Sequence, residues 1–382
     1  MIGSDSAWVA RAEAVAREVL ARHAGDVDAR ARWPAEGVAA LAEAGLLGLT
    51  VPAAIGGAGA GPATFAAVTR AMAEQCASTA MIYLMHVCAT QVVVQAPSFP
   101  LREELLRRTA AGRHLATLAF SEPGSRSHFW APVSQVAVEG DRHRLSADKS
   151  WVTSAGHADG YVVATRSSRA AELTDSTIYY VPRGAPGLGV RGPFDGLGLR
   201  GNASAPMRLE GVTVPASHRV SDDGAGFPLM MGAVLPWFQV GSAAVSLGIA
   251  RAATAGIRQH LLASKLEHLG QPLASLMNLR ARLAQMQLAA DKHEAFLADV
   301  CRRMAEGSPD LMLSLLEVKA AAAEMALAVT DLAMRTGGGA AFSRHLSVER
   351  NFRDARAAAV MAPTTDVLYD FIGRILLDMP LL

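Results

Sequence analysis

Two polar segments about thirty residues apart carry side chains suited to holding a ligand. Segment 121–127 reads SEPGSRS and follows the apolar run 118–120, while segment 149–154 reads KSWVTS and ends in two hydroxyls. Backbone N–H groups in a turn, an aromatic face and hydroxyl donors together suit a planar ring with heteroatoms, such as a flavin. Taken separately, Trp151 could be a core aromatic and Ser121 a turn or helix cap.

The composition favours a helix-rich protein that acts on a small molecule. Hydrophobic residues make up 51% of the 382 residues, and 36 basic side chains balance 35 acidic ones. No net charge therefore draws the chain to nucleic acid or to an anionic membrane. Neither a signal peptide nor eighteen unbroken apolar residues is visible, which predicts a soluble cytoplasmic enzyme. Cys76, Cys88 and Cys301 lack metal-ligand spacing, so we expect reduced core cysteines and no metal.

The elements that must position these segments fall into three stretches. Helices are predicted over 8–24, 34–44, 63–75 and 78–95, with Gly45 as a C-cap. The glycine-rich segment 56–61 lacks the Gly-Lys-Ser/Thr ending of a phosphate loop and reads better as the turn that enters a helix. Short β-branched runs predict strands at 133–138, 160–164, 178–181 and 209–214. Long helices then follow over 232–265, 272–306, 309–335 and from about 347, which suggests a bundle.

This order and several motifs resemble the acyl-CoA dehydrogenase superfamily. Val51-Pro52 with Gly56-Gly57 is similar to its V-P-x-x-x-G-G, segment 121–124 to T-E-P-G, and 151–154 to W-I-T-N/S. Similar matches occur at 198–201, 212–215, 338–339 and 349–355. The resemblance implies an α+β fold with an N-terminal helical domain (1–115), a middle β-barrel-like domain (116–218) and a C-terminal four-helix bundle (219–382).

The same resemblance implies an FAD site assembled in a homodimer or homotetramer, where a helix of the partner completes each flavin site. The residues expected to bind the cofactor are Leu118, Phe120, Ser121, Ser127, Trp151, Thr153, Ser154, Arg335, Gly338, Gly339, Thr364 and Asp366. The arginine that usually holds the diphosphate aligns with Leu266, and a nearby glutamine with Met277. Arg335 is our candidate replacement, with Lys265 as its competitor. Weakly held reduced FAD or FMN is the other possibility.

The proton acceptor of the family is missing from its usual places. Members remove two hydrogens from Cα and Cβ of an acyl thioester, and a glutamate nine residues after the arginine of R-D-A takes the α proton. Here that count leads from Arg353 to Ala362, followed by Pro363. The other known base position aligns with Phe238, beside Gln239 in place of an arginine. Loss of a positioned base typically costs about two to four orders of magnitude in rate. Phe238 and Gln239, with Ser127, are expected to contact substrate.

Few residues could replace that base. His86 lies in an apolar helix whose counterpart borders the substrate pocket, although a lone buried histidine is usually structural. His128 follows the 121–127 turn and has a loop role as its alternative, while Asp366 could contact the flavin instead. The arginines at 344, 350, 353 and 356 are expected to form a salt-bridged helix surface rather than a phosphate site.

Three functions follow from these observations. The first is an FAD-dependent oxidoreductase that oxidises an acyl thioester, linked to CoA or a carrier protein, at Cα–Cβ with a non-standard base. An electron-transfer flavoprotein would then accept the electrons. The second is a flavin-dependent monooxygenase on the same fold, using reduced flavin from a reductase and O₂. The third, a non-catalytic flavoprotein, fits an intact flavin site less well.

Overall fold

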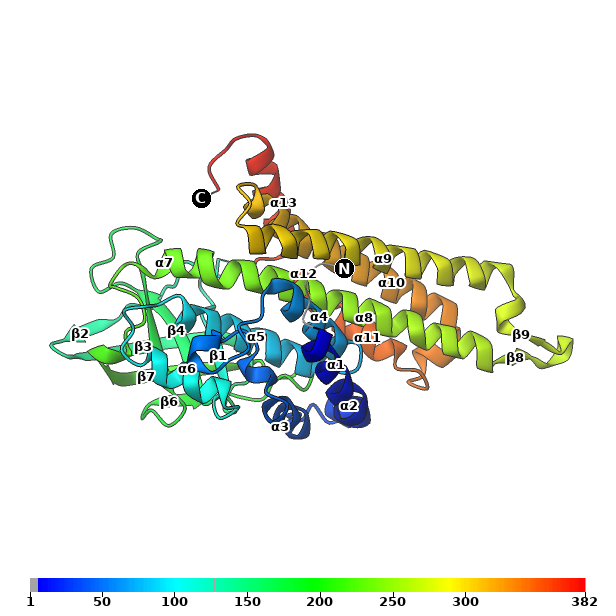
Figure 1. Cartoon of the computed structure of the whole chain (residues 1–382), viewed down its shortest axis with the longest axis horizontal. Helices are drawn as coiled ribbons and strands as arrows, with labels where there is room; N and C mark the ends of the chain where they lie inside the picture. Colours follow the sequence, from blue (N-terminus) through cyan, green and yellow to red (C-terminus); the bar gives the residue numbers. More distant parts are fainter. Residues whose placement is uncertain (1–5, 127, 382) are drawn as a thin grey trace.

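The computed structural model describes residues 6–126 and 128–381, and the chain forms three parts in sequence order (Figure 1). The first part is helical, and its α-helices are α1 (Ser6–Val15), α2 (Ala21–Ala29), α3 (Ala35–Glu43), α4 (Pro62–Ala73), α5 (Ala77–Val94) and α6 (Arg102–Ala110). A π-helical turn, Ala16–Leu20, joins α1 to α2. Gly45 follows α3 with φ +72°, which confirms the predicted left-handed helix ending.

Segment 56–61 is the entry turn of α4 and forms no phosphate loop. It leads into Pro62, the first residue of α4, where a missing N–H and a fixed φ cost the helix nothing. Helix α5 is buried along nearly its whole length and contacts strand β1 (Ala116–Ala119). The first part therefore presents its most apolar helix to the strand that precedes segment 121–127.

The middle part consists of two sheets around a shared apolar core. One sheet has the order β1-β4-β5, with β4 (Gly160–Arg166) and β5 (Ser176–Pro182) antiparallel and β1 parallel to β4. The other has the order β2-β3-β7-β6, formed by β2 (Ala137–Glu139), β3 (Arg142–Val152), β7 (Ala205–Pro215) and β6 (Leu188–Val190). Leu145, Tyr161 and Val212 are among the buried residues between them.

The strand predicted at 133–138 was wrong over most of its length, because the Glu122 carboxylate binds the backbone N–H groups of Val133 and Ser134.

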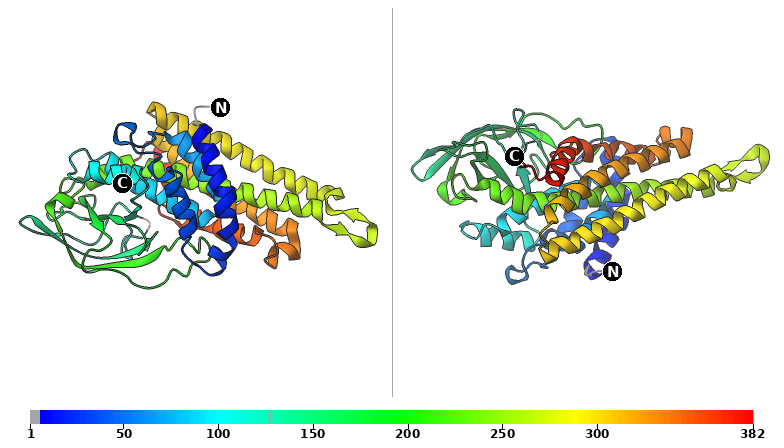
Figure 2. Two further views of the ribbon diagram at one scale, coloured as in Figure 1. Left: turned by 60° about the horizontal axis from the view of Figure 1, so that its bottom comes forward. Right: turned by 90° about the horizontal axis from the view of Figure 1, so that it is seen from above.

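The last part is a helix bundle built from α8 (Leu235–Ala263), α9 (Met277–Glu306), α10 (Leu311–Phe342) and α13 (Thr365–Leu376), with short helices α7 (Gly226–Leu229), α11 (Val348–Asp354) and α12 (Arg356–Val360) (Figure 2). A hairpin of β8 (Lys265–Leu266) and β9 (Gln271–Pro272) joins α8 to α9; it was not predicted and lies mostly between the two predicted helices, 232–265 and 272–306. Helix α10 runs beyond Arg335 and kinks at Gly338.

Two helices are long and apolar enough to cross a membrane, Ala77–Val94 and Gly226–Ala263. Their most apolar windows are 89% and 100% buried inside the protein, which is typical of core helices.

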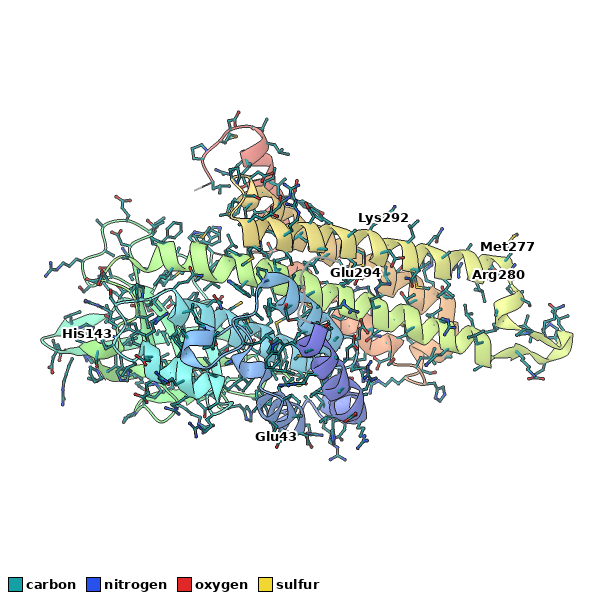
Figure 3. All side chains as sticks on the ribbon, viewed as in Figure 1. Glu43, His143, Met277, Arg280, Lys292 and Glu294 are labelled. Carbon is teal, nitrogen blue, oxygen red and sulfur yellow. The ribbon has the colours of Figure 1, made fainter. Side chains whose placement is uncertain are left out.

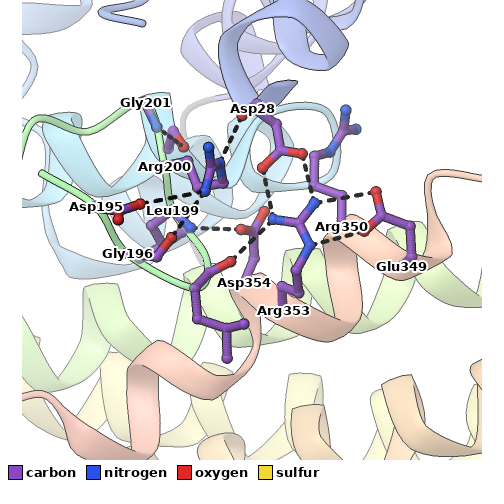
Figure 4. A network of polar contacts seen from close by, with 12 residues as sticks. Asp28, Asp195, Gly196, Leu199, Arg200, Gly201, Glu349, Arg350, Arg353 and Asp354 are labelled. Carbon is purple, nitrogen blue, oxygen red and sulfur yellow. Dashed lines mark hydrogen bonds and ion pairs between the residues drawn. The ribbon is translucent and has the colours of Figure 1, made fainter. Parts of the chain in front are cut away.

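One polar network joins all three parts of the chain (Figure 4). The Arg353 guanidinium on α11 donates to both carboxylate oxygens of Asp28 on α2, at 2.8 and 2.6 Å, and also binds Glu349. The Asp354 carboxylate accepts a 2.6 Å bond from the backbone N–H of Leu199 in the middle part, and burial raises its pKa to about 6. Gly198 is required beside this junction, because a Cβ there would lie 2.5 Å from the Arg353 carbonyl oxygen. Arg353 thus has the salt-bridged role predicted for the arginine cluster.

Candidate functional site

Segments 121–127 and 149–154 lie side by side, as their residue types suggested. The backbone N–H of Ser150 donates to the carbonyl oxygen of Ser121 at 2.9 Å. The hydroxyl of Thr117 on β1 donates to the carbonyl oxygen of Thr153 at 2.8 Å. Leu118 and Phe120 are buried at the end of β1. We call 118–121 and 150–154 together the cradle. Ser127 lies outside the described residues.

A buried ion pair fastens the two halves of the cradle from behind. Lys149 Nζ lies 2.6 Å from Glu122 Oε1 and also donates to the carbonyl oxygens of Phe120 and Ala164. Glu122 Oε2 accepts bonds from the backbone N–H groups of Val133 and Ser134. Burial lowers the pKa of Lys149. Burial raises that of Glu122, but the adjacent ammonium and the bonds from Ser134 bring the carboxyl below its ordinary pKa.

This ion pair was not predicted from the sequence, although the sequence contains a signal for it. Strand β3 alternates buried and exposed residues, and Lys149 occupies an inward position in that alternation. A lysine at an inward position requires a buried partner. Glu122, which immediately follows cradle residue Ser121, supplies that partner.

Two features of the cradle match an aromatic ligand. Trp151 is 69% exposed, with φ +53°. Within the described residues its ring contacts one other aromatic ring, that of Phe194, edge-on with 6.5 Å between the ring centroids. The Ser154 hydroxyl is buried and has no hydrogen-bond partner within the described part of the chain. An exposed indole face and an unused hydroxyl are what a planar cofactor with ring heteroatoms would engage. Thr153 differs, because its hydroxyl already lies 2.9 Å from that of Ser204.

A cavity of about 70 Å³ brings the cradle together with positions 238 and 362, which align with the two places where the family carries its base. Its lining residues are Met85, Leu118, Phe120, Ser121, Phe129, Ser150, Trp151, Val234, Phe238 and Ala362. Ala362 and Phe238 therefore share one pocket with the flavin-type cradle, although they come from widely separated parts of the chain. Among the described residues, the lining side chains include no carboxylate, imidazole or amine, so their only polar groups are the hydroxyls of Ser121 and Ser150 and the indole N–H of Trp151.

The geometry argues against His86 as the replacement base. The ring is fully buried, its Nε2–H donates to the Leu47 carbonyl oxygen at 3.0 Å, and Nδ1 accepts from the Ala116 N–H at 3.1 Å. Both nitrogens are thus used, and burial lowers the pKa of His86 to about 4. Its neighbour Met85 lines the pocket instead. His86 therefore holds β1 against α5 and keeps a structural role. His128 stacks on Trp130 in the following loop.

Three other residues predicted to contact the cofactor or substrate, Thr364, Asp366 and Gln239, are not in the lining of this pocket. Thr364 is the N-cap of α13, where its hydroxyl accepts a 3.5 Å bond from Val367 N–H, and Asp366 is exposed in the first turn. Gln239 is fully buried, is absent from the pocket lining, and neither of its amide atoms has a partner among the described residues.

Arg335, the residue predicted to bind the cofactor diphosphate, lies away from this chain's own cradle. The backbone of exposed Arg335 accepts a bond from Arg282, near the start of α9, and Gly338 and Gly339 follow on the same helix. Met277 and Arg280 mark that start, at the end of the bundle opposite the two sheets of the middle part (Figure 3). A single chain therefore does not bring Arg335 to Trp151.

No cluster of three or more potential metal ligands occurs within residues 6–126 and 128–381. The three cysteines are buried and unpaired, as predicted, and burial raises the pKa of each thiol.

Solved structures share this three-part α+β fold. A butyryl-CoA dehydrogenase from Megasphaera elsdenii superposes with a TM-score of 0.93 at 22% identity, covering 99% of both chains. An FAD complex of PigA superposes with a TM-score of 0.90 at 20% identity, covering 98% of both chains.

Sequence comparison gives the family. The acyl-CoA dehydrogenase N-terminal, middle and C-terminal domain models match residues 4–113, 117–212 and 224–377, so the chain belongs to the acyl-CoA dehydrogenase superfamily. The short-chain specific acyl-CoA dehydrogenase of Bos taurus is 28% identical over 347 residues, covering 90% of this chain and 83% of the relative.

Proposed function

We propose that the protein is an FAD-dependent oxidoreductase that oxidises an acyl thioester at Cα–Cβ without the usual glutamate. The observation that carries this proposal is the pocket shared by Trp151, Phe238 and Ala362. It combines a free aromatic face with an apolar wall that includes both positions at which the family carries its base. The names of the matched relatives support an acyl-CoA substrate.

The residues present fit FAD. The exposed face of Trp151 would stack on the ring, the unpartnered Ser154 hydroxyl would bond to it, and Thr364 would approach from the start of α13. The bound flavin supplies the acceptor for the hydride that leaves Cβ. One of the matched structures is an FAD complex, whereas no comparison supports FMN.

The chain's own residues position the acyl group and exclude water. Met85, Phe129 and Phe238 form an apolar wall, and Phe129 and Phe238 are themselves buried. Ser121 and Ser150 supply the hydroxyls of this lining and are partly exposed. We assign to these hydroxyls the relay of the α proton to solvent water, in which each hydroxyl donates its own proton as it accepts another, because no carboxylate, imidazole or amine lines the pocket among the described residues.

A flavin-dependent monooxygenase is the second candidate, and one observation favours it. The pocket lining contains no titratable side chain, and oxygenation with reduced flavin and O₂ requires no acceptor for an α proton. This function needs a flavin reductase as partner, whereas the dehydrogenase needs an electron-transfer flavoprotein.

We further propose that a second copy of the chain completes each flavin site. Arg335 and Gly338–Gly339 lie away from the cradle of their own chain, and a diphosphate without a cation is poorly held. Arg335→Ala should therefore weaken FAD binding, even though Trp151 and its surroundings are unchanged. Unaltered FAD affinity in Arg335→Ala would contradict this assignment.

Anaerobic mixing with a panel of acyl-CoA and carrier-linked thioesters tests the proposed function. Loss of the visible absorbance of oxidised FAD is the expected result for at least one thioester. If no thioester reduces the FAD, but reduced FAD with O₂ converts a substrate, the monooxygenase is the correct function. The Ser121→Ala and Ser150→Ala variants then test the hydroxyls, with Ser308→Ala, between α9 and α10, as the matched control.

A further inference from the structure

A buried lysine lies behind the pocket wall at the position of the missing base. Lys319 on α10 is 1% exposed, and its ammonium donates to three backbone carbonyl oxygens: those of Ala358 at 3.0 Å, Met361 at 3.2 Å and Pro363 at 2.8 Å. All three N–H donors of the ammonium group therefore have an acceptor.

These acceptors belong to one short connection that is poor in donors of its own. Ala358 lies in the last turn of α12, where carbonyl groups have no partner within the helix. Pro363 has no N–H to offer, and its carbonyl directly precedes the N-cap of α13. A cation at this place satisfies carbonyl groups at and just after the end of α12, and the carbonyl group of the residue that precedes the N-cap of α13. Ala362, between Met361 and Pro363, is thereby fixed on both sides.

The same ammonium reaches the opposite wall of the pocket. Nζ lies 6.0 Å from the centre of the Phe238 ring on α8, and Phe238 lines the cavity together with Ala362. No carboxylate within the described residues forms an ion pair with Lys319, so its charge is balanced by carbonyl dipoles alone. Burial lowers the pKa of Lys319 to about 7, while the three carbonyl oxygens favour the charged form.

We propose that Lys319 is a positioning residue, which holds the 358–363 connection against α8 and α10 and so sets the Ala362 wall of the pocket. Lys319 does not line the cavity and has no free donor for a ligand. It acts through Ala362, Phe238 and the start of α13. The part of this proposal that concerns cofactor affinity rests on the proposed function, while the part that concerns the connection does not.

Hydrogen–deuterium exchange tests the connection directly. We compare Lys319→Met, which keeps the length but removes all donors, with Lys319→Arg and with Lys292→Met on the exposed face of α9 (Figure 3). Amides of residues 357–368 should exchange about tenfold faster or more in Lys319→Met, while those of β7 should stay unchanged. The Arg variant should restore at least part of the protection, and Lys292→Met should match the unmutated protein. Exchange within about twofold of the unmutated protein in Lys319→Met would overturn the proposal.

FAD titration of the cofactor-free protein gives the second readout. Lys319→Met should bind FAD several-fold more weakly, because α13 and Thr364 lose their fixed start. Equal FAD affinity with faster exchange would confine Lys319 to the connection and overturn its link to the cofactor. If the unmutated protein binds no FAD, the proposed function fails, and hydrogen exchange still decides the role of Lys319. Should the Met variant not fold, Lys319→Gln replaces it under the same criteria.

Discussion

Lys149 Nζ and Glu122 Oε1 lie 2.6 Å apart, and each residue directly adjoins one half of the cradle. Glu122 follows Ser121, and Lys149 precedes Ser150. Both side chains are almost completely buried, with exposures of 0% and 4%. The alignment of the two cradle segments therefore depends on a charge pair that lies outside the lining of the pocket.

Breaking this pair should destabilise the fold strongly. Glu122→Gln leaves the Lys149 charge without a counter-ion, and removing one partner of a buried pair costs about 3–5 kcal/mol. Urea unfolding measures this loss. Arg107→Gln removes one partner of an exposed pair with Glu103 and should cost less than about 1 kcal/mol. Equal effects of the two substitutions would contradict the interpretation.

Removing the exposed indole should affect cofactor binding and leave stability nearly unchanged. Trp151→Ala deletes a ring that is 69% exposed and so contributes little to the core. Stacked aromatic pairs are worth about 0.5–1.5 kcal/mol, which corresponds to about a two- to thirteen-fold loss of FAD affinity. Fluorescence titration measures that affinity, and Trp151→Phe should retain most of it. A large loss of thermal stability would mean that the indole supports the fold.

Adding a carboxylate at the family's usual base position should accelerate removal of the α proton. Ala362→Glu places an acceptor in the pocket wall beside Trp151 and Phe238. A positioned base contributes about two to four orders of magnitude, so reduction of FAD by acyl-CoA should accelerate within that range. Rapid-mixing absorbance follows the reaction, and Ala362→Gln controls for size. If the rise occurs only when Pro363→Gly is added, the proline restricts the new side chain.

The stability of the protein should fall in mild acid because of His86. Burial lowers the pKa of His86 to about 4 from an ordinary value of 6.5, so the folded state favours the neutral ring. Between those two values the unfolded chain binds more protons, and stability declines as the pH falls through this window. The contribution of His86 approaches about 3 kcal/mol near pH 4. In urea unfolding between pH 7.5 and 5, His86→Gln should show a shallower decline; an identical decline would exclude His86 as the cause.

The fold could be predicted from the sequence in most respects, because its signals are local. Helix periodicity, the glycine after α3 and the motifs at 121–124 and 151–154 each depend on a few neighbouring residues. The hairpin between α8 and α9 and the loop at 128–136 were missed. The backbone of that loop is held by Glu122, and sequence periodicity carries no signal for a distant buried carboxylate.

The sequence indicated which residues meet at the site, but not the hydrogen bonds that hold them in place. The meeting of Phe238, Ala362 and Trp151 followed from the resemblance. The structural role of His86 did not, because it depends on the carbonyl oxygen of Leu47, 39 residues away. The role of Lys319 was not predicted either, because its three hydrogen-bond acceptors are backbone carbonyl oxygens, and residue types do not indicate where those lie.

The separation of Arg335 from the cradle has a genetic consequence under the proposed assembly. A chain with a damaged cradle still offers an intact Arg335, and a chain that lacks Arg335 still offers an intact cradle. Two defective copies made in one cell should therefore form mixed assemblies in which some flavin sites are whole. An allele with a substitution in the cradle would then complement an allele with a substitution at Arg335. Two alleles that both damage the cradle, or both remove Arg335, would not complement each other.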